Sequence, residues 1–71
     1  MTPAQLRMAR SALKIGVRDL AALAGVTTAT ITRFENERGG LNAVTQDKLQ
    51  TALEKQGIEF YNGTGVKLVG T

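Results

Sequence analysis

Two short stretches of helical periodicity, separated by a break at Gly25, constrain the fold of this 71-residue chain more than any other feature. The stretches occupy residues 17–24 and 28–36, and each places its apolar residues on one side of a helix. These apolar residues are Leu20, Ala21 and Ala24 before the break, and Ile31 and Phe34 after it. Gly25 can adopt the left-handed backbone conformation of a tight turn. Thr27 is suited to cap the second helix, and the small Ala21 lets the two helices cross closely.

Two helices joined in this way form a helix-turn-helix, whose second helix enters the DNA major groove. The segment resembles the helix-turn-helix of the XRE (Cro/CI-type) family of bacterial and phage transcriptional regulators. The residues that carry the resemblance are Leu20, Ala21, Gly25, Val26, Ile31, Phe34 and Glu35. It extends from about residue 6 to residue 53. It implies a mainly α, four-helix, lambda-repressor-like DNA-binding domain over residues 1–57.

The composition narrows the classes of function. The chain has no Cys and no His, so it has no disulfide or thiolate metal site and lacks the commonest general base. Ser11 is the sole serine, and the six carboxylates form no recognised catalytic motif. We therefore expect neither an enzyme nor a cofactor. Nine basic residues against six acidic ones give a net charge of +3, a mild bias that is compatible with nucleic-acid binding.

The sequence predicts neither a membrane-spanning segment nor a signal peptide. No apolar run approaches the roughly 20 residues needed to cross a bilayer. The N-terminus lacks the basic region and apolar core of a signal peptide. We expect a cytoplasmic protein with no membrane partner. Because a chain of this size buries a small core, dimerisation is a reasonable source of added stability.

Capping signals predict one helix on each side of the central pair. Thr2, Pro3 and Gln5 indicate a helix start with a capping box, and this helix should end near Ile15 and Gly16. Asn42 should cap a fourth helix that runs to Gln56 and is terminated by Gly57. The apolar residues of that helix are Val44, Leu49, Ala52 and Leu53.

Residues 58–71 change period and predict a C-terminal β-hairpin. Residues 58–61 and 66–69 alternate, and Asn62-Gly63-Thr64-Gly65 lies between them. Because an isolated hairpin is unstable in water, Phe60, Val66 and Leu68 must pack on the helices or on another chain. Two alternatives remain: the hairpin pairs with its mate across a two-fold axis as a dimerisation element, or it caps the core of a monomer.

The exposed face of the third predicted helix supplies the candidate base contacts. Helical geometry places Thr28, Ala29, Thr32 and Arg33 opposite the apolar face. Hydroxyls can bond phosphates or base edges, methyl groups can touch the thymine methyl, and Arg33 can bind guanine or phosphate. A plain surface helix would seldom carry four threonines in so short a stretch, because β-branched residues are poor helix formers.

The family resemblance implies further contacts. It implies a pair between Arg10 and Glu35 that also brings Arg10 near the phosphates, and phosphate contacts from the loop after the third helix. The complete candidate DNA-binding set is Arg10, Val17, Arg18, Thr27, Thr28, Ala29, Thr32, Arg33, Asn36 and Arg38.

The chain departs from the family where the second helix begins. Gly16 replaces the usual serine-type cap, and Val17 replaces a glutamine that donates to a DNA phosphate. Val17 cannot donate from its side chain, but backbone amides and Arg18 remain available. The departure affects the phosphate contact and leaves the fold unaffected.

The expected function is a sequence-specific double-stranded DNA-binding regulator, a repressor, that acts as a homodimer. The alternative is a protein-interaction module on the same fold, either an antitoxin or an anti-activator, whose partner would be a toxin or an activator.

Overall fold

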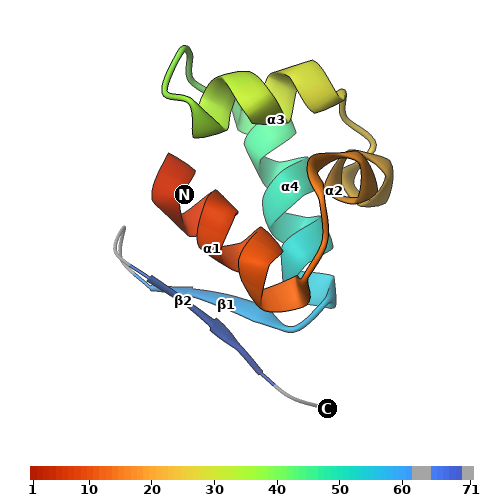
Figure 1. The fold of residues 1–71 in the computed structure, drawn as a ribbon, viewed down its shortest axis with the longest axis vertical. Coiled ribbons are helices and arrows are strands. Elements are labelled where there is room, and N and C mark those ends of the chain that lie inside the picture. The colour runs from red at the N-terminus through yellow and green to blue at the C-terminus, as the bar shows by residue number, and fades with distance from the viewer. Residues whose placement is uncertain (62–64, 70–71) are drawn as a thin grey trace.

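The computed structural model describes residues 1–61 and 65–69. Four helices come first: α1 (Pro3–Leu13), α2 (Val17–Ala24), α3 (Thr28–Glu35) and α4 (Ala43–Lys55). A two-stranded antiparallel hairpin of β1 (Ile58–Tyr61) and β2 (Gly65–Leu68) follows them (Figure 1). The predicted mainly α fold with a C-terminal hairpin is confirmed. Residues 62–64 of the predicted connection lie outside the described part of the chain. No helix within the described ranges has the length and apolar character needed to span a bilayer.

The predicted helix caps are present. The hydroxyl of Thr2 accepts from the backbone N–H of Gln5 at 3.1 Å, and the side-chain oxygen of Gln5 accepts from the N–H of Thr2 at 2.9 Å. These bonds satisfy donors that a helix N-terminus leaves free, and Pro3 at the first helical position has no N–H that would need a partner. The other two caps are Thr27, which accepts from Thr30 N–H at 3.2 Å, and Asn42, which accepts from Thr45 N–H at 2.8 Å.

Each helix is followed by a residue with a positive φ. These residues are Lys14 (φ 58°), Gly25 (φ 70°), Glu37 (φ 58°) and Gly57 (φ 96°). The left-handed conformation turns the chain so that the next amides reach back to the last free carbonyls of the helix. Two of the four positions are therefore occupied by residues with side chains, for which this conformation is unfavourable.

The end of α1 differs from the prediction. The helix stops at Leu13, and Lys14 takes the left-handed conformation expected nearer Gly16. The amide of Ile15 closes the end by donating to the carbonyl of Arg10 at 3.1 Å. Gly16 has an extended backbone and stands instead as the residue before α2. Lysine is not a residue type that indicates the end of a helix, so the sequence pattern predicted the end near Gly16 instead.

The core lies where the four helices meet β1. Its buried members are Leu6, Ala9, Leu20, Ala21, Ile31, Phe34, Leu49, Leu53 and Ile58. Val44 was expected on the apolar face of α4 but is 65 % exposed. It precedes Leu49 by five residues, which places it about 140° away around the helix. Val44 therefore points to solvent, while the later turns of α4 bury their apolar side chains.

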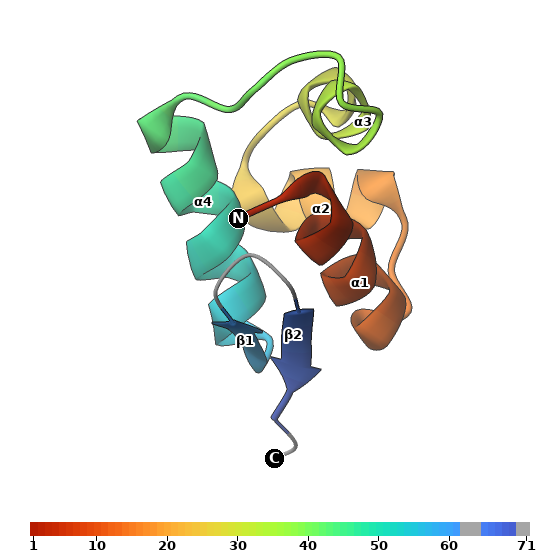
Figure 2. The same ribbon diagram turned by 90° about the vertical axis from the view of Figure 1, so that its left-hand side faces the viewer.

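The hairpin covers the helices on the side of the molecule opposite α3 (Figures 1 and 2). Phe60 faces Val66 in the antiparallel register, and both pack against the core. Leu68 faces the buried Ile58 but is itself exposed. β2 spans residues 65–68, one residue earlier than predicted. Phe60 and Val66, two of the three apolar side chains expected to need packing partners, therefore pack within the same chain.

Gln5 has a second role that the capping pattern does not reveal. Its side chain is 2 % exposed, and its amide nitrogen donates to the carbonyls of Tyr61 at 2.7 Å and Gly65 at 3.1 Å. Tyr61 and Gly65 are paired across the hairpin. A single side chain therefore holds both strands to the first turn of α1.

Candidate nucleic-acid interface

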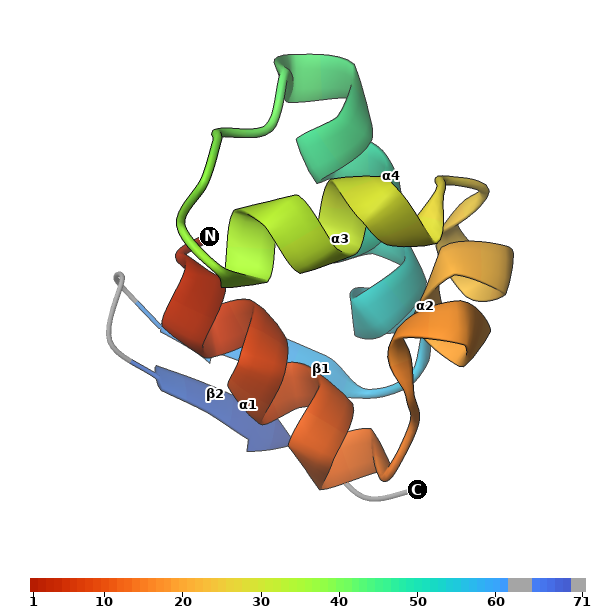
Figure 3. The same cartoon turned by 45° about the horizontal axis from the view of Figure 1, so that its top comes forward.

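The outward face of α3 is exposed over its whole length. Ile31 and Phe34 are buried, as predicted, and fix the opposite face to the core. The exposed residues are Thr28, Ala29, Thr32 and Arg33. Figure 3 shows α3 at the front of the molecule, with α2 beside its first turn and α1 near its last. Packing against the core therefore holds α3 in place, and the outward face of the helix is left uncovered.

The threonine hydroxyls of this segment differ in their surroundings. The hydroxyl of Thr27 accepts the Thr30 amide and lies 2.8 Å from the Thr30 hydroxyl. Thr27 is exposed, but its oxygen is engaged in capping. The side chains of Thr28 and Thr32 make no hydrogen bond to any other residue of the described chain. Their hydroxyls and methyl groups are free to contact a ligand.

Two arginines of α1 anchor the C-terminal end of α3. Arg10 donates from Nε and Nη2 to the two carboxylate oxygens of Glu35, each at 2.7 Å, and its Nη1 donates to the Ile15 carbonyl at 3.3 Å. Arg7 donates to the backbone carbonyl of Glu35. Cations at a helix C-terminus also complement its negative dipole end. The position of Arg10 therefore suits it to orient α3.

The Arg10–Glu35 pair is largely shielded from water. The side chains are 22 % exposed for Arg10 and 8 % exposed for Glu35. The hydrogen bond to Glu35 raises the pKa of Arg10, burial opposes the rise, and the attraction between the charges adds to it. The contribution of Arg7 was not predicted, because a bond to a backbone carbonyl leaves no sequence pattern.

At the start of α2, the two candidate residues point in different directions. Val17 is partly buried and packs against the core. Arg18 is exposed, and its guanidinium has no hydrogen-bond partner among residues 1–61 and 65–69. The amide of Gly16 donates to the Asp19 carboxylate at 3.4 Å. Val17 can therefore offer a ligand only its backbone amide, whereas Arg18 can offer its side chain.

The loop after α3 places two more candidates at the end of that helix. Asn36 and Arg38 are exposed. The amide of Arg38 donates to the Arg33 carbonyl at 2.9 Å, which closes the helix end around Glu37. A Cβ added at Gly39 would lie 3.5 Å from Cδ of Arg33, so the stem of Arg33 runs beside this loop. Arg33 and Arg38 thus occupy the same end of α3.

The charge of this surface is only moderately positive. The exposed cations on α2, α3 and the following loop are Arg18, Arg33 and Arg38, and the exposed acids are Asp19 and Glu37. A polyanion would meet three guanidinium groups that have no ion-pair partner in the described part of the chain. With so small an excess, its recognition must also use hydrogen bonds and shape.

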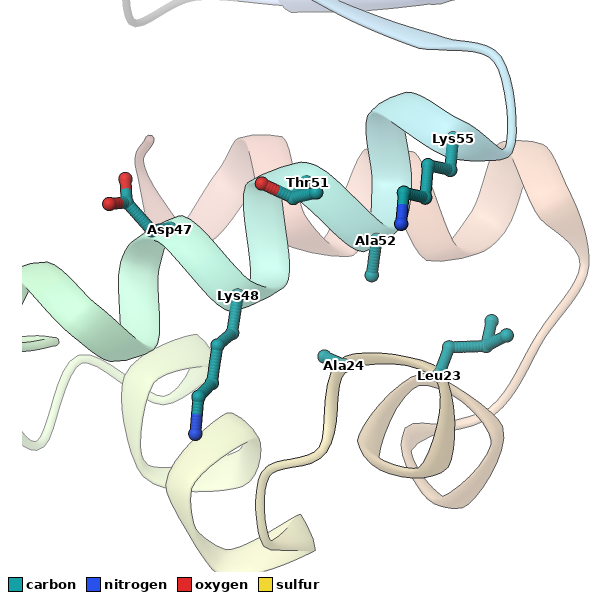
Figure 4. A pocket seen from close by; sticks show the side chains of 7 residues that line it. All are labelled: Leu23, Ala24, Asp47, Lys48, Thr51, Ala52 and Lys55. Atoms are coloured by element: carbon teal, nitrogen blue, oxygen red, sulfur yellow. The ribbon is translucent and has the colours of Figure 1, made fainter.

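A separate groove of about 350 Å³ lies between α2 and α4. The residues that line it are Leu23, Ala24, Asp47, Lys48, Thr51, Ala52 and Lys55 (Figure 4). Leu23 is 49 % exposed, and Lys48 and Lys55 flank Ala52 along α4. The groove therefore combines apolar side chains with two lysines and one aspartate, Asp47. It shares no residue with the exposed face of α3.

No protein-family model and no curated protein matches this chain. Among the described residues, no three His, Cys, Asp or Glu side chains lie together in a way that would hold a metal ion. The geometry of α3 and its surroundings is therefore the basis for assigning a function.

Proposed function

We propose that the protein is a sequence-specific double-stranded DNA-binding transcriptional regulator, a repressor of the XRE (Cro/CI-type) kind with a lambda-repressor-like fold. One observation carries the proposal. The face formed by Thr28, Ala29, Thr32 and Arg33 is exposed, while the opposite face of α3 is buried and its end is bound by Arg7 and Arg10. A short polar helix held rigidly at the surface is the form in which a helix-turn-helix presents its recognition helix. In this proposal the protein acts in the cytoplasm.

The neighbouring elements have the chemistry needed for phosphate contacts. With α3 in the major groove, the start of α2 would face one stretch of backbone with its amides and Arg18. The end of α3 would face another stretch with Asn36 and Arg38. Contacts of this kind fix the register of the protein on DNA, and contacts to base edges supply sequence specificity.

We further propose that the protein binds DNA as a homodimer and represses by occupying a promoter. Three of the six exposed large apolar side chains in the described chain lie on the hairpin or directly after it: Tyr61, Leu68 and Val69. This concentration favours the hairpin as the contact between protomers. Such a contact would leave α3 uncovered. For both α3 helices to face one duplex, the two protomers must meet edge to edge along the hairpin, with their α3 faces turned the same way.

Selection of bound duplexes from a random pool, at near-physiological salt, tests the DNA proposal. Enrichment of an inverted repeat with half-sites about one helical turn apart, roughly 34 Å, is the expected result. Arg33→Ala should then weaken binding to the selected site. Lys55→Ala removes an exposed cation on α4, outside both α3 and the hairpin, and should leave binding nearly unchanged. A folded protein that enriches no sequence would overturn the proposal.

Sedimentation equilibrium of surface variants tests the dimer. Removal of the whole tail would take the buried Ile58 out of the core and unfold the protein, so point substitutions are preferable. We expect Leu68→Lys to shift the mass toward the monomer. Val44→Lys also replaces an exposed apolar side chain, but far from the hairpin, and should leave the mass unchanged. Selection of a single half-site by a monomeric wild-type protein would exclude the dimer.

The groove between α2 and α4 favours a second candidate function, a protein-interaction module such as an antitoxin or anti-activator. Lys48 and Lys55 are seven residues apart, which on a helix is about 10 Å. Together with Leu23 they fit a partner segment that carries one large apolar side chain between two carboxylates. Co-expression with the product of a neighbouring gene tests this candidate. A complex that survives Lys67→Ala but is lost in Leu23→Asp would support it, and absence of a complex would reject it.

A further inference from the structure

We infer that α3 selects its DNA sites chiefly by contact with the 5-methyl groups of thymine. The inference rests on the proposed function and names the chemistry that the same surface would recognise. The half-sites would therefore be rich in A·T pairs where α3 faces the bases, and their thymines would lie at fixed positions.

The exposed face of α3 consists mainly of short side chains. Thr28 and Thr32 are four residues apart, so they lie one above the other on the helix, and Ala29 lies beside them. All three are exposed, and each ends in a methyl group on a short stem. Short side chains require the helix to approach the bases closely. In such an approach, methyl groups make up most of what α3 presents to the groove floor.

The exposed face lacks the side chains that usually read adenine through hydrogen bonds. Adenine is read by the amide of Asn or Gln with two bonds, and no such side chain lies within α3. Asn36 comes after the helix ends. The threonine hydroxyls can donate or accept, so they bond different bases without strong preference. The thymine methyl is the one base feature that the three residues distinguish well.

Arg33 is the one side chain of α3 that can read guanine with two hydrogen bonds. Its stem lies beside Gly39 at the C-terminal end of the helix, on the same side as Arg38. In the proposed docking, the loop that carries Arg38 faces the DNA backbone, whereas Thr32 lies in line with Thr28 at the N-terminus of α3. Arg33 is therefore placed to bind the backbone together with Arg38, and base readout falls to Thr28, Ala29 and Thr32.

Base analogues test the inference directly. In the selected duplex, each thymine facing α3 is replaced in turn by deoxyuridine, which removes the methyl group and keeps the pairing. We expect affinity to fall about three- to fivefold for each contacted thymine, the value of one buried methyl group. Replacing the same T·A pair by C·G should also weaken binding, and 5-methylcytosine at that position should recover part of the loss.

Matched variants assign each methyl contact to a residue. Thr32→Ser keeps the hydroxyl and removes the methyl, so it should lose discrimination between thymine and deoxyuridine at one position. Thr32→Val keeps a methyl and removes the hydroxyl, so it should retain that discrimination. The same pair of substitutions at Thr28 should act at a different position. Because both side chains are exposed, the variants should fold normally.

The outcomes separate this inference from the function on which it rests. A protein that selects a defined site but binds the deoxyuridine duplex equally well overturns methyl readout and leaves DNA recognition standing. A protein that selects no site overturns the proposed function itself. If Arg33→Ala relaxes selection at one G·C pair, Arg33 reads a base. A uniform loss on all sequences, with a smaller dependence on salt, is the expected result for a phosphate contact.

Discussion

Arg10 and Glu35 join α1 to the end of α3 through two parallel hydrogen bonds, each 2.7 Å long. The planar guanidinium matches the two oxygens of the carboxylate, which a lysine could not do. Because the carboxylate is nearly buried, removing one partner costs more than it would in an exposed ion pair, since the remaining charge is left in a poorly solvated site. The orientation of the exposed α3 face depends on this connection.

Removal of Arg10 should therefore be costly. Arg10→Ala leaves the Glu35 carboxylate buried without its main partner, and we expect a loss of about 2–3 kcal/mol in the free energy of unfolding. Urea denaturation measures this loss. Arg18→Ala removes an exposed arginine with no partner among the described residues and should change stability by less than about 0.5 kcal/mol. The double variant Arg10→Ala/Glu35→Ala should be more stable than the sum of the two single losses predicts. Additive losses would show that the two side chains are not coupled.

Gln5→Glu should detach the hairpin without removing the helix cap. The introduced carboxylate still accepts the Thr2 amide, but it has no N–H to donate to the carbonyls of Tyr61 and Gly65. We expect a loss of about 1–3 kcal/mol, with the largest increase in hydrogen exchange in β1 and β2.

The same variant has a defined pH dependence. Burial beside two carbonyl oxygens would raise the pKa of the introduced carboxyl above its unfolded value. A raised pKa in the folded state means that stability is greater at low pH and is lost as pH rises through that pKa. Gln5→Glu should therefore regain stability in acid relative to wild type. A difference between the two proteins that does not change with pH would contradict a buried, hairpin-facing position for this side chain.

Gly25 and Gly57 form a matched pair for separating backbone strain from steric clash. Both have positive φ, but a Cβ at Gly25 meets nothing within 4 Å, while one at Gly57 would lie 2.7 Å from the Val69 carbonyl oxygen. Gly25→Ala should cost about 1–2 kcal/mol, the cost of the left-handed conformation alone. Gly57→Ala should cost more, because the end of β2 must also move away. Equal losses in thermal unfolding would show that the contact with Val69 is easily relieved.

Glu37→Gly should stabilise the protein. Glu37 holds a left-handed conformation (φ 58°) in which a side chain is unfavourable and glycine is common. Although glycine also gains freedom in the unfolded chain, we expect a net increase of about 0.5–1 kcal/mol. Lys14→Gly offers an independent test at the end of α1, which has the same φ. A loss of stability in both variants would contradict the left-handed helix ends.

Tyr61 is the only tyrosine, and the chain has no tryptophan, so near-ultraviolet absorbance follows its ionisation alone. Its hydroxyl donates to the Glu59 carboxylate at 3.0 Å, and this bond raises the pKa of Tyr61 above 10.0. The stabilisation is therefore present at neutral pH and is lost as pH rises through the raised pKa. Glu59→Gln should shift the titration to lower pH. An unchanged titration would show that the hydroxyl does not bond this carboxylate in solution.

Sequence patterns among neighbouring residues predicted most of the fold. The bounds of α2 and the caps Thr2, Thr27 and Asn42 follow from residues no more than a few positions apart, and the structure confirms them. The buried face of α3 likewise follows from the spacing of Ile31 and Phe34. The candidate contact residues on that face are exposed, although Val17, named for its position in the family pattern, packs inward. The roles of all the candidate contact residues in DNA binding stay predictions.

The features that escaped prediction depend on distant partners or on backbone geometry. Gln5 donates to carbonyls 56 and 60 residues away. Because every residue has a backbone carbonyl, no sequence pattern indicates which one a distant side chain will contact. Arg7 likewise bonds a carbonyl of a helix that lies 28 residues further along. Lys14 and Glu37 adopt a conformation associated with glycine, so their residue types gave no indication of a helix end.

The bonds from Gln5 to the hairpin also imply an order of events in folding. Contacts within the helix-turn-helix close short loops, whereas Gln5 must meet Tyr61 and Gly65 across nearly the whole chain, and long loops cost more entropy to close. We expect the helices to assemble in the transition state and the hairpin to dock afterwards. Substitutions at this junction would then accelerate unfolding while leaving the folding rate almost unchanged. The lifetime of the native state would thus be set at the hairpin, on the side of the molecule opposite α3.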